Sequence, residues 1–351
     1  MNRELEARTV GFRPGERNVF LHLLTGCNLS CRHCYINPAQ HGQAMLSLQT
    51  VEKWLQLLVG PDEPGNLILL GGEPTLHPGL AEIVRIAASM GYHVTVDSNG
   101  YLFHDFLDRV SPRELDFLSF SLDGPDPGVN DPIRGEGVFA TCTANLRRAV
   151  EKGFRTSLIY TVSGLNIDHL HRMPPLLADL GVERFFIQVI GLRGKPASGE
   201  PQEGIGWQVD PDHWLRVVPP VAREVAATGI HVTYPKVFLD PGERFQCAGI
   251  VAENFFVFPN GRVYRCPLCE DYPIHSLVIE GDRLCSRSGL NEDRFFSLSI
   301  PEGCVMHKLL QGENIAYLPD GRPRHRISCC LLKQEVIPRE NRQPRECSDA
   351  S

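Results

Sequence analysis

Residues 18–35 read NVFLHLLTGCNLSCRHCY and join an apolar run to three closely spaced cysteines. Asn18–Leu24 predicts a buried strand, because it is short and almost continuously apolar. Cys27, Cys31 and Cys34 follow it in a C-x3-C-x2-C pattern. Three thiolates on one tight loop can bind three irons of a 4Fe-4S cube and leave the fourth iron open, whereas ferredoxins use a different spacing and a further cysteine. The stretch therefore predicts an iron–sulfur site at the end of a strand.

Strand-like and helix-like stretches alternate from residue 18 to about residue 234. Residues 47–59 have the apolar spacing of a helix with Ser47 as N-cap, and residues 66–70 (NLILL) form the next apolar strand. About six such β-α units predict an α/β fold, a partial (βα)6 TIM-like barrel over residues 18–240. Parallel barrels place their chemistry at the carboxyl ends of the strands, where the cysteine loop begins.

The chain changes character after about residue 240, where short strands, turns and most of the other cysteines follow. Residues 255–265, with a turn at Pro259-Asn260-Gly261, predict a β-hairpin, and residues 275–284 predict a second one. The parts predicted outside the barrel are an N-terminal extension (1–17), a small cysteine-rich domain that caps the barrel mouth (241–338) and a disordered tail (339–351).

Residues 191–206 (GLRGKPASGEPQEGIG) are rich in glycine and proline and have no periodicity. Such a stretch fits a surface linker, and it fits a mobile flap over the barrel mouth equally well. The sequence leaves these two alternatives open.

Charge and cysteine usage limit the partners that we expect. A formal net charge of −7 over 351 residues argues against nucleic acid or an anionic membrane as the main partner. No apolar run approaches the roughly 18–20 residues of a membrane span, and the first 20 residues lack the apolar region of a secretory signal. The twelve cysteines are therefore expected to be reduced thiols, spaced for metal, in a cytoplasmic protein.

The cysteine loop resembles the signature of the radical S-adenosylmethionine superfamily, C-x3-C-x-aromatic-C. Cys27, Cys31 and Cys34 match its three cluster ligands, and His33 stands at the aromatic position, where the family places a side chain near the adenine. The resemblance covers roughly residues 18–234. Further short motifs follow successive predicted strands in the family's order: GGEP at 71–74, DSNG at 97–100, SLDG at 121–124 and NDPIRG at 130–135.

The resemblance assigns cofactor contacts to these motifs. The GGEP segment is expected along the methionine end of S-adenosylmethionine, with the glutamate near its ammonium, and Arg134 is expected to pair with its carboxylate. The residues implied in cofactor binding are His33, Gly71, Gly72, Glu73, Pro74, Ser98, Asn99, Ser121, Asp123 and Arg134. Each short motif alone also fits a plain turn, but together they favour the family.

In this family, one electron from the cluster cleaves S-adenosylmethionine, and the 5′-deoxyadenosyl radical removes a hydrogen atom from substrate in the barrel mouth. The resemblance thus implies a small-molecule or peptide substrate, and a one-electron reductant such as flavodoxin or ferredoxin. It identifies no further catalytic residue. A non-catalytic iron–sulfur electron carrier or sensor is the alternative, although such a protein would not need the GGEP, SLDG and DPIRG motifs.

A second cysteine group resembles the opening of the SPASM/twitch auxiliary-cluster domain, C-x9–15-G-x4-C. Cys247, thirteen residues, Gly261, four residues and Cys266 match this pattern. We expect Cys269 and Cys304 to complete one auxiliary 4Fe-4S cluster, with Cys285 in reserve.

Structural zinc is the rival for this second group, because Cys266-x2-Cys269 and Cys304-x2-His307 form a CxxC…CxxH pattern. The adjacent Cys329 and Cys330 fit core thiols, or a pair near the substrate, better than two ligands of one metal. Cys142, in a predicted helix, is expected to serve packing.

Overall fold

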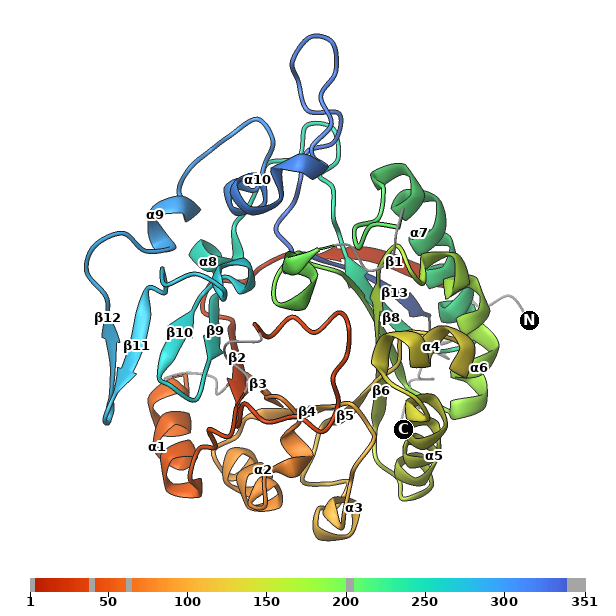
Figure 1. The fold of residues 1–351 in the computed structure, drawn as a ribbon, viewed down its shortest axis with the longest axis vertical. Helices are drawn as coiled ribbons and strands as arrows, with labels where there is room; N and C mark the ends of the chain where they lie inside the picture. Colours follow the sequence, from red (N-terminus) through yellow and green to blue (C-terminus); the bar gives the residue numbers. More distant parts are fainter. Residues whose placement is uncertain (1–3, 38–41, 61–64, 200–204, 340–351) are drawn as a thin grey trace, which may run out of the picture.

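The computed structural model describes residues 4–37, 42–60, 65–199 and 205–339. Its centre is one 13-stranded sheet in the order β1-β13-β8-β7-β6-β5-β4-β3-β2-β9-β10-β11-β12. The sheet curls into an open ring, and most of the helices lie outside the ring (Figure 1). The predicted partial α/β barrel is therefore confirmed.

Eight neighbouring strands of this sheet run parallel. They are β2 (Arg17–His22), β3 (Asn66–Leu70), β4 (His93–Ser98), β5 (Phe117–Ser121), β6 (Thr156–Val162), β7 (Arg184–Val189), β8 (His231–Pro235) and β9 (Glu253–Val257). The six units predicted from the sequence correspond to β2–β7. The structure extends the parallel barrel by β8 on one side and by β9, which pairs with β2, on the other.

Helices connect these strands, and most of them cover the outer face of the barrel (Figure 1). They are α1 (Leu48–Leu58), α2 (Leu80–Ser89), α3 (Phe106–Arg109), α4 (Pro127–Arg134), α5 (Val138–Glu151), α6 (Met173–Leu180) and α7 (Pro211–Ala227), with the 3-10 helices η2 (Pro74–Leu76), η3 (Ile167–Arg172) and η4 (Lys195–Ser198). Ser47 caps α1 as predicted, since its hydroxyl accepts a hydrogen bond from Thr50 N at 3.1 Å. The buried residues of α1 belong to the same hydrophobic core as fully buried strand residues such as Leu67 and Leu69.

The segment NDPIRG, which alone also fitted a plain turn, forms the end of helix α4 and its cap. Asp126 is the N-cap of α4, its carboxylate accepts a hydrogen bond from Val129 N, and Pro127 occupies the first turn. The helix ends at Gly135, which has φ +127°. Arg134 thus projects from the last turn of a helix, which fixes its backbone more firmly than a loop would.

Both hairpins predicted after residue 240 form, and they continue the barrel sheet. β10 (Arg262–Tyr264) returns antiparallel along β9, and β11 (Leu277–Glu280) pairs with β12 (Arg283–Ser286). Gly261 has φ +83°, and a Cβ there would collide with the carbonyl of Ile279, so this turn requires glycine. Short helices complete the region: α8 (Ala248–Val251), η5 (Pro267–Cys269), α9 (Asp293–Phe296), α10 (Val305–Gln311) and η6 (Gly312–Asn314).

The two ends of the chain meet at the other edge of the sheet. β13 (Lys333–Pro338) pairs antiparallel with β8, and β1 (Leu5–Val10) pairs antiparallel with β13. The sequence assigned these stretches to an extension and to the cysteine-rich domain, yet hydrogen bonding carries both into the barrel sheet. The domain boundary at residue 240 stays a prediction, and nearly all of the predicted tail lies outside the described residues.

None of the helices in the described part of the chain has the length and apolar character needed to cross a membrane.

Candidate active site

A cavity of about 910 Å³ lies at the carboxyl ends of the parallel strands. Its lining includes the loop after β2 that carries the first three cysteines, hereafter the cluster loop (residues 23–37), and parts of the C-terminal region. Eight of the ten residues predicted to bind the cofactor line this cavity: His33, Gly71, Gly72, Glu73, Ser98, Asn99, Ser121 and Arg134. The other two, Pro74 and Asp123, are buried and are not part of this lining.

Cys27, Cys31 and Cys34 all face this cavity and form no disulfide. The loop that holds them is locally ordered, since Leu29 N donates to Cys27 Sγ at 3.4 Å and Cys34 N donates to Cys31 O at 3.4 Å. Burial raises the pKa of all three thiols, that of Cys27 to about 11. Metal binding must therefore release protons from these groups, and metal affinity will depend on pH.

The two glycines of the GGEP segment allow the turn after β3 to pack against the cluster loop. Gly72 N donates to Leu24 O and Glu73 N donates to Gly26 O, both at 2.9 Å. A Cβ on Gly72 would collide with the carbonyl of Gly26, and a Cβ on Gly71 would press on Leu24. The sequence suggested a close approach of these glycines to the cofactor, and the structure adds a close approach to the cluster loop itself.

The Glu73 carboxylate is 1% exposed and joins the ends of β3 and β4. Oε1 accepts hydrogen bonds from Thr75 N (3.1 Å), Thr75 Oγ1 (2.7 Å) and Ser98 Oγ (2.9 Å), and Oε2 accepts one from Asn99 N (2.8 Å). Burial raises the pKa of Glu73, although these hydrogen bonds oppose the rise. The carboxylate is thus largely used within the protein, with most of its remaining acceptor capacity on Oε2.

Asn99 connects the end of β4 to the cluster loop. Its Nδ2 donates to Asn28 Oδ1 at 2.8 Å and lies 3.9 Å from Cys27 Sγ, while its Oδ1 accepts from Tyr101 N at 2.9 Å. Mutual hydrogen bonds among the GGEP turn, the DSNG turn and the cluster loop therefore fix the three segments relative to one another.

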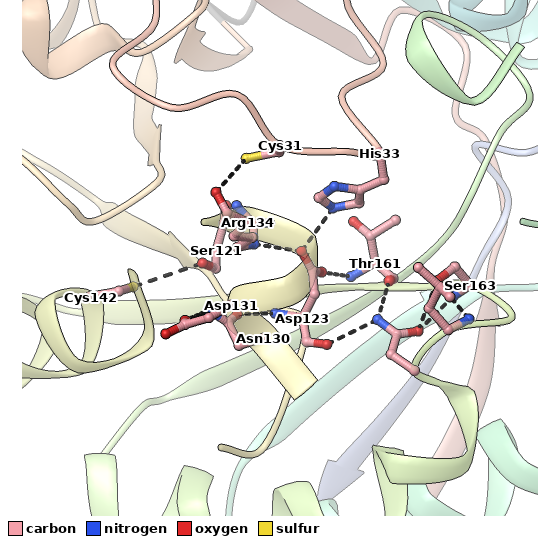
Figure 2. Close-up of polar contacts among 12 residues, drawn as sticks. Cys31, His33, Ser121, Asp123, Asn130, Asp131, Arg134, Cys142, Thr161 and Ser163 are labelled. Atoms are coloured by element: carbon pink, nitrogen blue, oxygen red, sulfur yellow. Dashed lines mark hydrogen bonds and ion pairs between the residues drawn. The ribbon is translucent and has the colours of Figure 1, made fainter. Parts of the chain in front are cut away.

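A buried charge cluster of Asp123, Arg134 and His33 lies beside Cys31 (Figure 2). Asp123 Oδ2 lies 2.5 Å from Arg134 Nε and 2.8 Å from His33 Nε2, and Oδ1 accepts from Thr161 N at 2.7 Å. Burial alone would raise the pKa of Asp123, but the charges of Arg134 and His33 outweigh it and hold that pKa well below its usual range. The ionised Asp123 therefore orients both partners.

His33 points toward Asp123, and its buried Nδ1 has no hydrogen-bond partner among the described residues. Arg134 also contacts the cluster loop, because its carbonyl accepts from Cys31 Sγ at 3.7 Å.

The DPIRG motif also stabilises the fold locally, through a contact of Asp131 that the sequence did not reveal. The Asp131 carboxylate accepts from Gly137 N and Phe139 N, each at 2.9 Å, and so joins α4 to the start of α5.

The described part of the stretch predicted as a linker or flap, residues 191–199, bridges the cluster loop and the C-terminal region. Lys195 N donates to Cys34 O at 3.0 Å, and Lys195 Nζ donates to Cys31 O at 2.9 Å. On the other side, Arg193 Nη1 donates to Glu270 Oε2 at 2.6 Å, and its guanidinium lies 4.6 Å from the Tyr35 ring centroid. Residues 200–204 of the same stretch lie outside the described residues.

The second cysteine group is larger than predicted. The predicted Cys247, Cys266, Cys269 and Cys304 come together with Cys329 and Cys330. A hydrogen bond with Cys329, together with burial, raises the pKa of Cys247, and Cys266 is paired in the same way with Cys269. The reserve candidate Cys285 lies apart from them on β12, opposite Val278 of β11. Cys329 and Cys330 are thus neighbours of the predicted ligands, which their sequence position did not indicate.

Cys304 and His307 of the CxxH pattern both line the cavity. Burial raises the pKa of Cys304 to about 12 and lowers that of His307 to about 4. Within the described ranges, no group of three or more His, Cys, Asp or Glu side chains is arranged to hold a single metal ion. Thiolates of a cube bind different irons, so they need not converge on one point as zinc ligands do.

Several known proteins are similar to this chain. A sequence model of the Radical SAM superfamily matches residues 21–173. The chain is 29% identical over 191 residues to pre-heme d1 synthase of Dinoroseobacter shibae (52% of this chain, 46% of that protein). It is 31% identical over 186 residues to PqqA peptide cyclase of Ruegeria pomeroyi (52% and 49%). The crystal structure of Streptococcus suis SuiB bound to precursor peptide SuiA has a TM-score of 0.60 at 12% identity (75% and 62%).

The matched residues include the three cluster-loop cysteines, the GGEP turn and the Asp123–Arg134 pair. The match over residues 21–173 is to the superfamily that the cysteine spacing predicted. The chain spans about half the length of the curated relatives that it matches. The likeness to SuiB, at 12% identity, is one of fold.

Proposed function

We propose that this protein cleaves S-adenosylmethionine reductively, and that the resulting 5′-deoxyadenosyl radical abstracts a hydrogen atom from a bound substrate. The convergence of three cluster-loop thiols and Arg134 on one cavity of about 910 Å³ is the main support. An electron carrier or sensor needs no cavity of this size beside its cluster, whereas a small-molecule site does.

The cavity side chains fit the proposed cluster and cofactor. Cys27, Cys31 and Cys34 would each bind one iron, because all three thiols face the cavity from one loop. Arg134 would bind the cofactor carboxylate, since its ion pair with Asp123 uses Nε and orients the rest of the guanidinium fork. Oε2 of Glu73 would accept from the cofactor ammonium.

The other residues predicted to contact S-adenosylmethionine are proposed to line its binding site. Gly71, Gly72 and Pro74 would shape the methionine end, Ser98 and Asn99 the ribose side, and Ser121 the wall beside Arg134. His33 would contribute to the adenine site as the family implies, while its bond to Asp123 fixes the ring in place.

An auxiliary 4Fe-4S cluster is the second part of the proposal. Cys247, Cys266, Cys269 and Cys304 were predicted as ligands, and the bond between Cys247 and Cys329 adds Cys329 as a candidate. Since these thiols are buried or half-buried and six cysteines gather in one place, a site that binds several irons accounts for them better than packing does. Structural zinc is the competing occupant.

The substrate that we propose is a peptide or a cofactor precursor. Support comes from the names of the relatives, which include a PqqA peptide cyclase and a pre-heme d1 synthase, and from the fold shared with SuiB, which was solved with a precursor peptide. A cytoplasmic location and a one-electron reductant such as flavodoxin or ferredoxin complete the proposal, because the cluster thiols must stay reduced.

Product analysis tests the proposed reaction. The anaerobically reconstituted and reduced protein should convert S-adenosylmethionine to methionine and 5′-deoxyadenosine, measured by chromatography with mass detection. Cys31→Ala should abolish the products, while the matched control Cys285→Ala, on the outlying strand β12, should retain them. Undiminished cleavage by Cys31→Ala would show that the cluster loop is not the site.

A further inference from the structure

Lys333 begins β13 and projects into the cavity inside the barrel. Its Nζ lies 4.7 Å from the centroid of the Phe186 ring of β7, which also lines the cavity. Three residues along β13, Val336 is 1% exposed and belongs to the hydrophobic core. This alternation along the strand places Lys333 on the inner face of the sheet.

Strand register places Lys333 at the same height along the barrel axis as the polar residues Thr161 and Gln188, which lie between Lys333 and the proposed cofactor site. Thr161 pairs with Gln188 across β6 and β7, and Lys333 pairs with Pro235 across β13 and β8. The β7–β8 register, continued by two residues from Phe186↔Thr233, sets Gln188 level with Pro235. All of these side chains line the cavity. Thr161 also donates its N–H to Asp123, so one end of this level lies at the charge cluster that holds Arg134.

Lys333 is a cation without an acidic partner. Within the described part of the chain, no carboxylate lies within 4.0 Å of its ammonium, whereas Lys152, Lys236 and Lys308 each form such an ion pair. The guanidinium groups that share the cavity are compensated by carboxylates. These pairs are Arg134–Asp123, Arg193–Glu270 and Arg324–Asp212.

A cation inside a barrel is unfavourable unless an anion or a set of hydrogen bonds compensates it, and the Phe186 ring supplies only part of that compensation. One ammonium at the level of the Gln188 amide, which lines the same cavity, matches a single negative charge with two acceptor oxygens. A phosphate or another polyanion would be matched better by several cationic groups at one place.

We propose that Lys333 binds a carboxylate of the substrate inside the barrel, with Gln188 beside it, and thereby sets which hydrogen atom faces the cofactor. This inference rests on the proposed function. A peptide can supply such a carboxylate from an Asp or Glu side chain or its C-terminus, and a cofactor precursor can supply it from an acid side chain, so the chemistry is shared by both substrate classes. Lys333 is a specificity-determining residue in this account.

The first test uses glutarate as the carboxylate probe and glutaramide as its neutral counterpart. The reconstituted holoenzyme with S-adenosylmethionine is acetylated briefly with N-acetoxysuccinimide, and the labelled lysines are measured by mass spectrometry. Glutarate should slow acetylation of Lys333 at least fivefold and leave Lys152, on the barrel exterior, unchanged. Glutaramide should protect neither. Equal protection by both probes, or none by glutarate, would overturn the proposal.

The second test measures glutarate affinity by calorimetry. Lys333→Met should weaken binding roughly tenfold or more, because a charge-assisted hydrogen bond is lost, while Lys333→Arg should keep it within about threefold and Lys152→Met should leave it unchanged. Cleavage of S-adenosylmethionine is measured in the wild type and in Lys152→Met, which separates failure of this inference from failure of the proposed reaction. Because Cys329 and Cys330 act on Lys333 electrostatically, a counter-charge role is the competing explanation. A shifted auxiliary-cluster potential in Lys333→Met with unchanged glutarate affinity would establish that role and refute ours.

Discussion

Replacing Asp123 by Asn should destabilise the protein strongly, because it leaves the buried Arg134 without its charge partner. Asp123 is fully buried, and its Oδ2 lies 2.5 Å from Arg134 Nε and 2.8 Å from His33 Nε2. Asn can still accept from Thr161 N through its oxygen, but its NH2 group would then face two other donors. Breaking a buried pair by removing one partner costs about 3–5 kcal/mol, so we expect a loss of that size in the free energy of unfolding.

Guanidinium unfolding under anaerobic conditions measures this loss. The matched control is Asp108→Asn, whose partners Arg148 and Lys152 lie on the surface and whose pairs are screened by solvent, so little change is expected there. The folded-state pKa of Asp123 is depressed, so its contribution is present above the unfolded pKa of about 3.9 and is lost as the pH falls below it. The contribution of Asp123 ionisation to this difference should therefore persist at every pH from 8 to 5. Equal, small effects of both substitutions would refute the reasoning.

Three further predictions concern the two cysteine sites. Gly72→Ala should lower iron incorporation at the cluster loop without changing the far-UV circular dichroism. The control Gly11→Ala, with open space around its Cβ, should change neither the iron content nor the circular dichroism. Lys195→Met removes an ammonium that bonds a cluster-loop carbonyl, so the midpoint potential of that cluster in a redox titration should fall by roughly 50–100 mV at constant iron content. Replacing the three cluster-loop cysteines together should leave about four irons per chain, and adding Cys247→Ala and Cys266→Ala should remove them. A colourless triple variant with one zinc would establish the zinc alternative instead.

The barrel and the first site could be predicted from the sequence because their signals are local. Each strand from β2 to β7 is a short apolar run, and the residues that line the cavity follow those runs directly. Parallel strands bring their carboxyl ends together, so the order of motifs along the chain was sufficient to gather Cys27, Glu73, Asn99 and Arg134 at one cavity.

The parts that the sequence did not reveal depend on pairing between distant segments. Nothing in the composition of β13 indicates that it lies between β8 and β1, since an antiparallel partner more than 300 residues away leaves no local pattern. Lys333 therefore could not be recognised as a cavity residue. Cys329 could not be predicted as a neighbour of the auxiliary-site cysteines for the same reason, because its contact with Cys247 joins segments about 80 residues apart.

The role of Asp123 also required the structure. SLDG fits both a turn and a cofactor contact. The fold brings Arg134, at the end of α4, and His33, on the cluster loop, against one buried carboxylate (Figure 2). The spacing of residues in the sequence does not show that the Arg134 guanidinium faces the Asp123 carboxylate as well as the expected cofactor carboxylate.

Electron paramagnetic resonance of the reduced holoenzyme tests most directly whether an iron held by the cluster loop is open to the cofactor. We predict that adding S-adenosylmethionine changes the spectrum of wild type and of Cys285→Ala. It should leave the spectrum unchanged in a variant lacking Cys27, Cys31 and Cys34, whose only remaining cluster is the proposed auxiliary one. A wild-type spectrum that does not respond to S-adenosylmethionine, or a response that survives in the triple variant, would contradict the assignment of the cluster loop as the cofactor site.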